Sequence, residues 1–215
     1  MAKIITVEEA ASMIKDGMSV MVSGFWGVGA PDKILHQIVA NGTKNLTAMS
    51  ISASMPGRGS GILIDGKCVS KFIASFVGRN KEAAKQMEAG ELEVEFTPQG
   101  TLAERCRAGG FGLGGILTPT SLGMELGEGK PIIEVDGKKY VLETALKADF
   151  ALIKANKADK AGNLIYHKAT RNTNPLMAPA GKITICQVDE IVEIGEMDPN
   201  DVMTPGVFVD YLVQS

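Results

Sequence analysis

The stretch DGMSVMVSGFWGVGAP, Asp16 to Pro31, organises the rest of the sequence. Its apolar run, Met18 to Val22, predicts a strand, and Pro31 opens a predicted helix. The turn between them contains three glycines, Gly24, Gly27 and Gly29. Glycine takes positive φ at little steric cost and lets another group approach the backbone closely. In an open α/β sheet, ligands bind beyond the carboxyl ends of the strands, so this turn is predicted to border a binding site.

The composition indicates an ordinary globular protein. The chain has 215 residues, of which 45% are hydrophobic and 22% charged, with a net charge of −3. We therefore expect one domain over residues 1–215, with a sizeable core. The acidic balance and scattered basic residues argue against nucleic acid or membrane as a partner. The sequence has no apolar run of membrane-spanning length and no signal-peptide pattern, so we expect a cytoplasmic location.

The cysteines and histidines do not suggest a metal site. The chain has three cysteines, Cys68, Cys106 and Cys186, which are far apart in the sequence. Their spacing is not that of metal ligands, so we expect reduced thiols and no bound metal. His36 and His167 have no second ligand at metal spacing and are predicted to be structural.

Strand and helix signals alternate along most of the chain. Strands are predicted at residues 18–22, 46–51, 71–76, 92–97, 150–155, 164–166, 183–188 and 207–212. Capping boxes are predicted at Thr6–Glu9 and Thr101–Glu104, the second after a turn at residues 98–100. Asp136-Gly137 between apolar runs predicts a hairpin, added to the sheet as a small antiparallel flap. The pattern predicts an α/β fold with an open, largely parallel sheet and helices on both faces.

A third glycine-rich loop follows the helix that ends near residue 110. Gly110 to Gly115 has the spacing G-x-G-x-x-G, but the dinucleotide fingerprint requires a strand before it and a helix after it. We therefore expect the loop to line a pocket or to pack against a neighbouring backbone. A nicotinamide-dependent oxidoreductase remains a less favoured alternative.

Several blocks of the sequence resemble the family I coenzyme A transferases. The opening stretch matches the family's N-terminal signature, with Ser23 in place of the usual first glycine. Similar blocks follow at Phe96 to Gly112, Ala148 to Pro175 and Met203 to Val213. The resemblance thus extends from about Thr6 to Val213.

The resemblance implies an enzyme that moves CoA from a short-chain acyl-CoA to a free carboxylate of the acetoacetate, acetate or butyrate class. CoA is then a substrate, and no cofactor is expected. Members of this family use a ping-pong mechanism through a glutamyl-CoA thioester. The family's glutamate motif, Ser-Glu-Asn-Gly, is absent from this sequence. The resemblance therefore implies an α subunit that pairs with a homologous β subunit carrying the nucleophile, as an α2β2 assembly.

The same resemblance suggests site residues. Gln99 is predicted to donate a hydrogen bond to the oxyanion of the tetrahedral intermediates, the alternative being that it only closes a turn. The loop of Gly24, Phe25, Gly27 and Gly29 is expected to bind substrate as a wall of the acyl pocket. Trp26 either borders this pocket or packs at a subunit interface. Ser52 and Ser54 stand where many members have asparagine, and are candidate substrate contacts.

Other polar residues have competing interpretations. Arg171, Asn172 and Asn174 either hold loops together or contact substrate. Arg105 and Arg107 are expected on an exposed helix face, toward solvent or an interface, and Glu104 in a capping box. A non-catalytic module that binds acyl-CoA or a carboxylate is the main alternative to a transferase.

Overall fold

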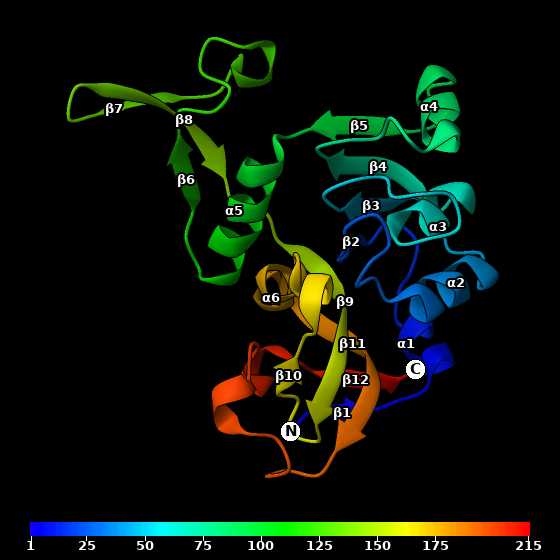
Figure 1. The fold of residues 1–215 in the computed structure, drawn as a ribbon. Helices are drawn as coiled ribbons and strands as arrows, with labels where there is room; N and C mark the ends of the chain where they lie inside the picture. The colour runs from blue at the N-terminus through cyan, green and yellow to red at the C-terminus, as the bar shows by residue number, and fades with distance from the viewer.

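The computed structural model describes residues 1–215 and contains two sheets (Figure 1). The large sheet has nine strands in the order β1-β12-β11-β9-β2-β3-β4-β5, with β10 paired antiparallel to β9 and all other pairs parallel. Its strands are β1 Lys3–Ile4, β2 Ser19–Val22, β3 Leu46–Met49, β4 Val69–Ala74, β5 Glu93–Phe96, β9 Ala148–Asp159, β10 Leu164–Ile165, β11 Gly181–Val192 and β12 Tyr211–Gln214. The expected open, largely parallel sheet is confirmed. The predicted strand at 207–212 was placed too early, because residues 206–208 form a 3-10 turn.

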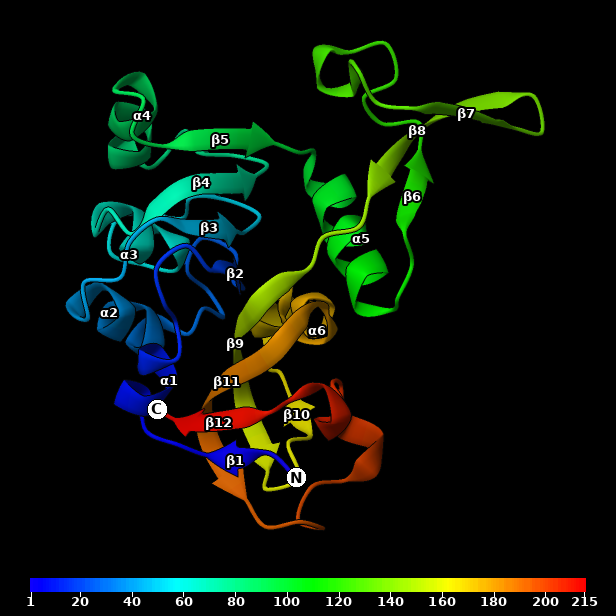
Figure 2. The ribbon, with the colours of Figure 1, turned by 180° about the vertical axis from the view of Figure 1, so that it is seen from behind.

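Helices cover both faces of this sheet (Figures 1 and 2). On one face lie α1 Val7–Ser12, α2 Asp32–Ala40, α3 Ser60–Asp65 and α4 Lys81–Glu88, and on the other α5 Gln99–Gly110 and α6 Asn174–Met177. Short 3-10 helices span Glu125–Gly127, Lys168–Arg171, Ala178–Ala180, Pro199–Asp201 and Gly206–Phe208. No helix of the chain is long and apolar enough to cross a bilayer.

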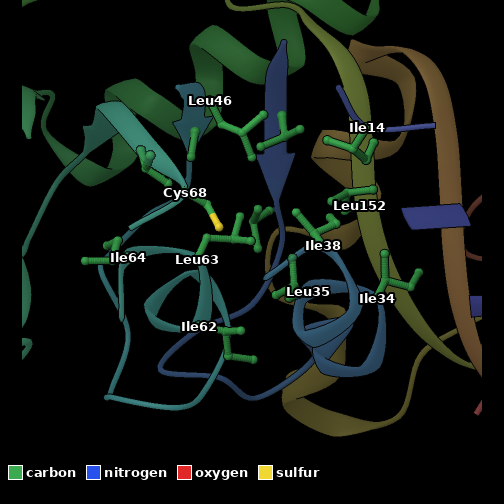
Figure 3. Packing of buried hydrophobic residues seen from close by; sticks show 14 of the residues in the cluster. Ile14, Ile34, Leu35, Ile38, Leu46, Ile62, Leu63, Ile64, Cys68 and Leu152 are labelled. Atoms are coloured by element: carbon green, nitrogen blue, oxygen red, sulfur yellow. The ribbon is translucent and has the colours of Figure 1, made fainter. Parts of the chain in front are cut away.

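Each face of the sheet has its own apolar core. Figure 3 shows the first, where Leu35 and Ile38 of α2 and Leu63 of α3 pack beneath Leu46 and Leu152 of the sheet. These side chains are fully buried, and each such leucine or isoleucine stabilises the fold by about 1.5–3 kcal/mol. The second core places α5 and α6 against the opposite face. The sheet is thereby held rigid between two layers, and its strand ends become fixed points for loops.

The two predicted capping boxes have different outcomes. The first is confirmed, because Glu9 N donates to Thr6 Oγ1 at 3.1 Å and Thr6 N donates to Glu9 Oε2 at 2.8 Å. The second is wrong, because α5 begins at Gln99, directly after Pro98, and Glu104 instead pairs with Arg107 at 2.8 Å. Strand β5 ends at Phe96, so Thr97 and Pro98 complete the connection and no separate turn precedes the helix.

The predicted flap forms a sheet of its own. β6 Gly115–Thr118, β8 Lys138–Thr144 and β7 Ile132–Val135 make an antiparallel arm that projects away from the large sheet (Figures 1 and 2). The hairpin turn at Asp136-Gly137 is confirmed, with φ of 50° and 72°. Its addition to the large sheet is wrong, because the third glycine-rich loop contains β6, which pairs with β8.

Close backbone packing explains the glycines at two positions of that loop. A Cβ at Gly115 would lie 2.4 Å from Glu143 O, and a Cβ at Gly109 would lie 1.8 Å from Leu146 O. The expected packing against a neighbouring backbone is thereby confirmed. The G-x-G-x-x-G spacing leads into a strand, which is the opposite of the dinucleotide fingerprint.

The arm packs over α5 and buries Arg105, so the predicted exposure of this side chain is wrong. Arg105 is only 6% exposed. Its Nε donates to Thr144 O at 2.8 Å, and its Nη1 donates to Glu95 Oε1 at 3.1 Å. Arg107 lies on the outer side of α5 and is partly exposed, as expected.

Candidate functional site

The loops that follow four parallel strands lie at one edge of the large sheet. The chain leaves β2 at Ser23, β3 at Ser50, β4 at Ser75 and β5 at Thr97. A cleft of about 420 Å³ lies among these loops. It is lined by Phe25, Trp26, Ile51, Ser52, Ser75, Phe76, Pro98 and Gln99. This is the crevice beyond the carboxyl ends of the strands, where an open sheet binds its ligand.

A second hollow adjoins the cleft, with a volume of about 300 Å³. It is lined by Phe25, Ile51, Gln99, Gly100, Ala103, Asn172, Thr173 and Leu176. Phe25, Ile51 and Gln99 line both spaces. The tertiary structure therefore brings together Phe25, Trp26, Ser52, Gln99 and Asn172, which the sequence had marked as candidates in four separate segments.

The glycine-rich turn builds one wall of the cleft. Phe25 and Val28 exchange two backbone hydrogen bonds of 3.0 Å, which closes a tight turn with Trp26 at φ 54° and Gly27 at φ 87°. The turn presents Phe25 and Trp26 with their rings stacked, 5.9 Å between centroids. Gly24, Gly27 and Gly29 line neither hollow. Gly24 lets the turn fold closely on itself, and the other two let it pack against the loops behind it.

Ser23 fits the position at which the resemblance led us to expect a glycine. Its φ is not positive, and its buried hydroxyl donates to Gly29 O at 3.1 Å. This hydrogen bond fastens the start of the turn to its end. The substitution therefore preserves the shape of the loop.

Gln99 is the first residue of α5, and its side chain is exposed in the cleft. The side-chain amide makes no hydrogen bond within the chain, so it does not act as a turn-closing group. The first N–H groups of a helix also carry partial positive charge. A neutral donor at a helix N-terminus suits the stabilisation of negative charge that develops on a substrate oxygen.

The asparagines after β10 hold the glycine-rich turn in place. Asn172 Nδ2 donates to Val28 O at 2.9 Å, and Asn174 Nδ2 donates to Gly29 O at 3.0 Å. Asn174 is fully buried and also accepts from Lys154 N at 2.8 Å. Of this polar group, only Asn172 reaches a hollow, while Arg171 is exposed outside both. The expected loop-holding role fits Asn172 and Asn174.

The two candidate serines have different surroundings. Ser52 lines the cleft, and its Oγ accepts from Ser54 N at 3.3 Å. Ser54 is buried at φ 53°, beside Ser60, and lines neither hollow. Ser54 therefore shapes the loop that carries Ser52.

Sequence reasoning missed the loop after β4. Ser75 and Phe76 line the cleft, and the Arg79 guanidinium lies 4.3 Å from the centroid of the Trp26 ring. The signal that could have found this loop was the rule already applied to β2 and β3, that residues following a parallel strand gather at one edge of the sheet.

Two exposed arginines flank the glycine-rich turn. No acidic residue lines either hollow, while Arg58 and Arg79 are exposed beside the turn. Asp32, at the start of α2, accepts from Gly59 N at 2.9 Å, and its burial raises the pKa of that carboxyl group. The histidines lie elsewhere and are exposed, and no group of His, Cys, Asp or Glu is arranged to hold a metal ion.

The comparisons with known proteins agree on one family. The model of the coenzyme A transferase family matches residues 4–215. The chain is 43% identical to the alpha chain of an acetate CoA-transferase from Escherichia coli, over 99% of this chain and 97% of that one. It is 49% identical to one of the subunits of the succinyl-CoA:3-ketoacid coenzyme A transferase of Xanthomonas campestris, over 94% of this chain and 84% of that one. It is 45% identical to the alpha chain of an acetoacetyl-CoA:acetate/butyrate CoA transferase from Clostridium acetobutylicum, over 99% of this chain and 98% of that one.

A solved structure supports the fold. Glutaconate coenzyme A-transferase from Acidaminococcus fermentans superposes with a TM-score of 0.87, at 22% identity, over 100% of this chain and 76% of that one. At 22% identity, this similarity is evidence for the fold alone. The family match and the three sequence relatives establish that this chain belongs to the coenzyme A transferase family, as an α subunit of such an enzyme.

Proposed function

We propose that this chain and a homologous β subunit together move CoA from a short-chain acyl-CoA to a free carboxylate of the acetoacetate, acetate or butyrate class. The observation that carries the proposal is the cleft itself, in which a free amide donor, Gln99, faces an aromatic wall. No acidic residue lines this cleft. Such a half-site can stabilise an intermediate but holds no carboxylate to act as the nucleophile, which supports a nucleophilic glutamate on the β subunit.

The proposed reaction is ping-pong. The partner's glutamate attacks the thioester carbonyl, and the C–S bond breaks. CoA leaves as a thiolate, and the acyl group stays on the glutamate as an acyl-glutamyl anhydride. The thiolate then attacks the glutamyl carbonyl and releases the donor acid. The acceptor carboxylate attacks the resulting glutamyl-CoA thioester, and the C–S bond breaks to give a new acyl-glutamyl anhydride and the CoA thiolate. The thiolate then attacks the acyl carbonyl of this anhydride, which releases the new acyl-CoA and returns the glutamate.

In these steps Gln99 donates a hydrogen bond to the oxyanion of the tetrahedral intermediates, which makes it the catalytic residue of this chain. The stacked pair of Phe25 and Trp26 bounds the acyl group, and Ser52 meets it from the β3 loop. CoA acts as a substrate, and the mechanism requires no cofactor or metal. The assembly we propose is α2β2, with residues 1–215 as one domain of each α subunit.

The relatives differ in the acids that their names give, which are acetate, a 3-ketoacid with succinyl-CoA, and acetate or butyrate with acetoacetyl-CoA. We therefore propose short-chain acids in general as the substrate class of this protein. The three cysteines are free and buried, which agrees with a reducing compartment, and we propose the cytoplasm.

Intact-mass spectrometry after mixing this chain and its companion with acetoacetyl-CoA tests the proposal. We expect a CoA adduct on the companion chain, formed only when both chains are present. An adduct on this chain alone would place the nucleophile here and contradict the proposal that the β subunit carries it. Absence of both adduct and CoA transfer would favour a non-catalytic module that binds acyl-CoA or a carboxylate.

A further inference from the structure

The second hollow, of about 300 Å³, continues from the cleft along the surface of α5. Gln99 and Ala103 both line it and are four positions apart on this helix. Residues four apart lie on the same face of a helix, so the two side chains are neighbours along α5. At 1.5 Å per residue their positions are about 6 Å apart along the axis, about the length of four to five extended C–C bonds. A chain that begins at Gln99 can therefore reach Ala103 within this hollow.

Apolar side chains form most of the walls of this hollow. Phe25 and Ile51 belong to the loops after β2 and β3, and Leu176 belongs to α6, which packs against α5 (Figure 2). Ala103 is half-buried, and its methyl group is the smallest side chain among the hydrophobic residues that line the hollow. The space left free at this point of α5 therefore depends on residue 103 being small.

The polar side chains of the hollow, apart from that of Gln99, are already hydrogen-bonded. Asn172 Nδ2 donates to two backbone carbonyls, at 2.9 and 2.6 Å, and Asn172 Oδ1 accepts from Thr173 N and Oγ1 at 2.6 and 3.1 Å. Thr173 Oγ1 also accepts from Gly24 N at 3.3 Å. No charged residue lines the hollow. A polar group of a ligand would lose water there without gaining a partner, whereas methylene groups would gain apolar contacts.

We propose that the far end of the acyl chain lies in this hollow and that Ala103 sets the longest chain the enzyme accepts, that of a saturated acid of about five to six carbons. This inference rests on the proposed function and extends its substrate class. The carbonyl carbon stays at Gln99 and undergoes the exchange described above, and the distal carbons form and break no bond. Ala103 is thus a residue that determines specificity and takes no part in the chemistry.

An acyl chain fits the hollow better than the pantetheine arm of CoA. Pantetheine carries two amide groups, and an amide that leaves water without a hydrogen-bond partner costs free energy. The only unpaired side-chain amide at this hollow is that of Gln99, which the oxyanion requires. A saturated chain has no polar group to satisfy beyond its carbonyl.

The test compares hexanoate with acetate as acceptors, with acetoacetyl-CoA as the donor and the assembled complex as the enzyme. In a ping-pong reaction kcat/KM for the acceptor reports the second half-reaction alone, so the donor does not affect the comparison. Ala103→Leu fills the hollow with a bulkier side chain of high helix propensity. We expect the ratio of kcat/KM for hexanoate to that for acetate to fall about 10-fold or more, as when an apolar pocket loses room for a methylene group.

Ala84→Leu is the matched control, because Ala84 is exposed on α4 and lines neither hollow. It adds the same carbons at a distance from the cleft and should leave the ratio unchanged. A ratio that stays at the wild-type value in Ala103→Leu would overturn the inference. This holds whether both acids keep their kcat/KM or lose it equally, since an equal loss would show a general disturbance of the complex.

Leu176→Ala tests the same hollow from the facing helix, and it decides the question if Ala103→Leu does not fold. The shorter side chain leaves room for one more methylene group, so the ratio of heptanoate to hexanoate should rise about 4-fold. The double variant should regain part of the hexanoate activity lost in Ala103→Leu, because residues that line one space are coupled. A ratio that does not rise in Leu176→Ala would show that the acyl chain lies elsewhere and would overturn the inference.

A binding measurement separates this inference from the proposed function. Calorimetric titration of the assembled complex with hexanoate, without any CoA thioester, measures binding where no transfer can occur. Hexanoate should bind more tightly than acetate and with a more negative change in heat capacity, and Ala103→Leu should abolish this difference. Hexanoate binding without any CoA transfer would refute the function but keep the site, whereas transfer with an unchanged ratio would refute the site alone.

Discussion

Arg105 Nη1 donates a 3.1 Å hydrogen bond to Thr97 Oγ1, and this contact ties the middle of α5 to the chain two residues before Gln99. The same side chain bonds Thr144 O in the arm and Glu95 in β5. Arg105→Ala would leave the buried Thr97 hydroxyl, the Thr144 carbonyl and the half-buried Glu95 without this donor. We expect a loss of about 3 kcal/mol in the free energy of unfolding, measured by urea titration.

Arg107→Ala is the matched control for that prediction. Arg107 lies on the same helix, and its ion pair with Glu104 is exposed by 41% and 46% at the two side chains. Exposed pairs contribute about 0–1 kcal/mol, so this variant should unfold nearly as the wild type does. Equal losses in the two variants would show that the buried network at Arg105 does not anchor the arm.

Gln99→Ala should reduce kcat about 100-fold while KM for the acyl-CoA changes little, as when one oxyanion donor is removed. The side chain makes no hydrogen bond within the chain, so stability and assembly with the β subunit should be preserved. Steady-state kinetics and analytical ultracentrifugation measure the two properties. Gln37→Ala, the same change on the surface of α2, should leave kcat unaltered. Loss of assembly in Gln99→Ala would show instead that Gln99 has a structural role.

Gly29→Ala should lower the stability of the protein by more than the strain of its positive φ alone. Gly29 and Gly42 both have φ +74°, but a Cβ at Gly29 would lie 2.9 Å from Asn172 Nδ2, whereas nothing lies within 4 Å at Gly42. Gly42→Ala should therefore cost about 1–2 kcal/mol of backbone strain, and Gly29→Ala about 1–3 kcal/mol more from overpacking. Thermal unfolding of the two variants measures the difference. Equal losses of stability in the two variants would show that the loop behind the turn moves aside at no energetic cost.

Asp149 should make stability depend on pH in the acid range. Its carboxylate accepts from Lys182 Nζ at 2.7 Å and from the N–H and hydroxyl of Ser19, and these contacts lower its pKa from 3.8 to about 2. Because the folded pKa is the lower one, the contribution is complete above the unfolded pKa of 3.8 and is lost as the pH falls towards 2.

Asp149→Asn removes that contribution. The wild type should be more stable than this variant at pH 6, and the difference should shrink between pH 4 and pH 2. Unfolding free energies at a series of pH values give the comparison. A difference that stays constant over this range would show that the Asp149 carboxyl group does not titrate below its ordinary pKa.

The sequence by itself determined the strand, the turn and the helix around residues 16–42. Local rules decide these features: the apolar run forms β2, Gly24, Gly27 and Gly29 allow positive φ, and Gly42 ends α2. The Thr6–Glu9 capping box and the Asp136-Gly137 turn were predicted for the same reason. Each involves residues within a few positions of one another, so propensity and short-range hydrogen bonding suffice.

Only the tertiary structure decided which side chains share the cleft. Arg79 was overlooked because nothing in its own segment shows that Trp26, more than fifty positions earlier, lies beneath it. Arg105 was predicted to be exposed because its burial depends on the arm, whose strand β8 begins thirty-three positions later. Burial, stacking and ion pairing over such separations arise from the order of strands in the sheet and the packing of α5 against the arm. Local sequence determines the elements of this protein, whereas long-range packing determines the surroundings of each charge, and with them the chemistry of the cleft.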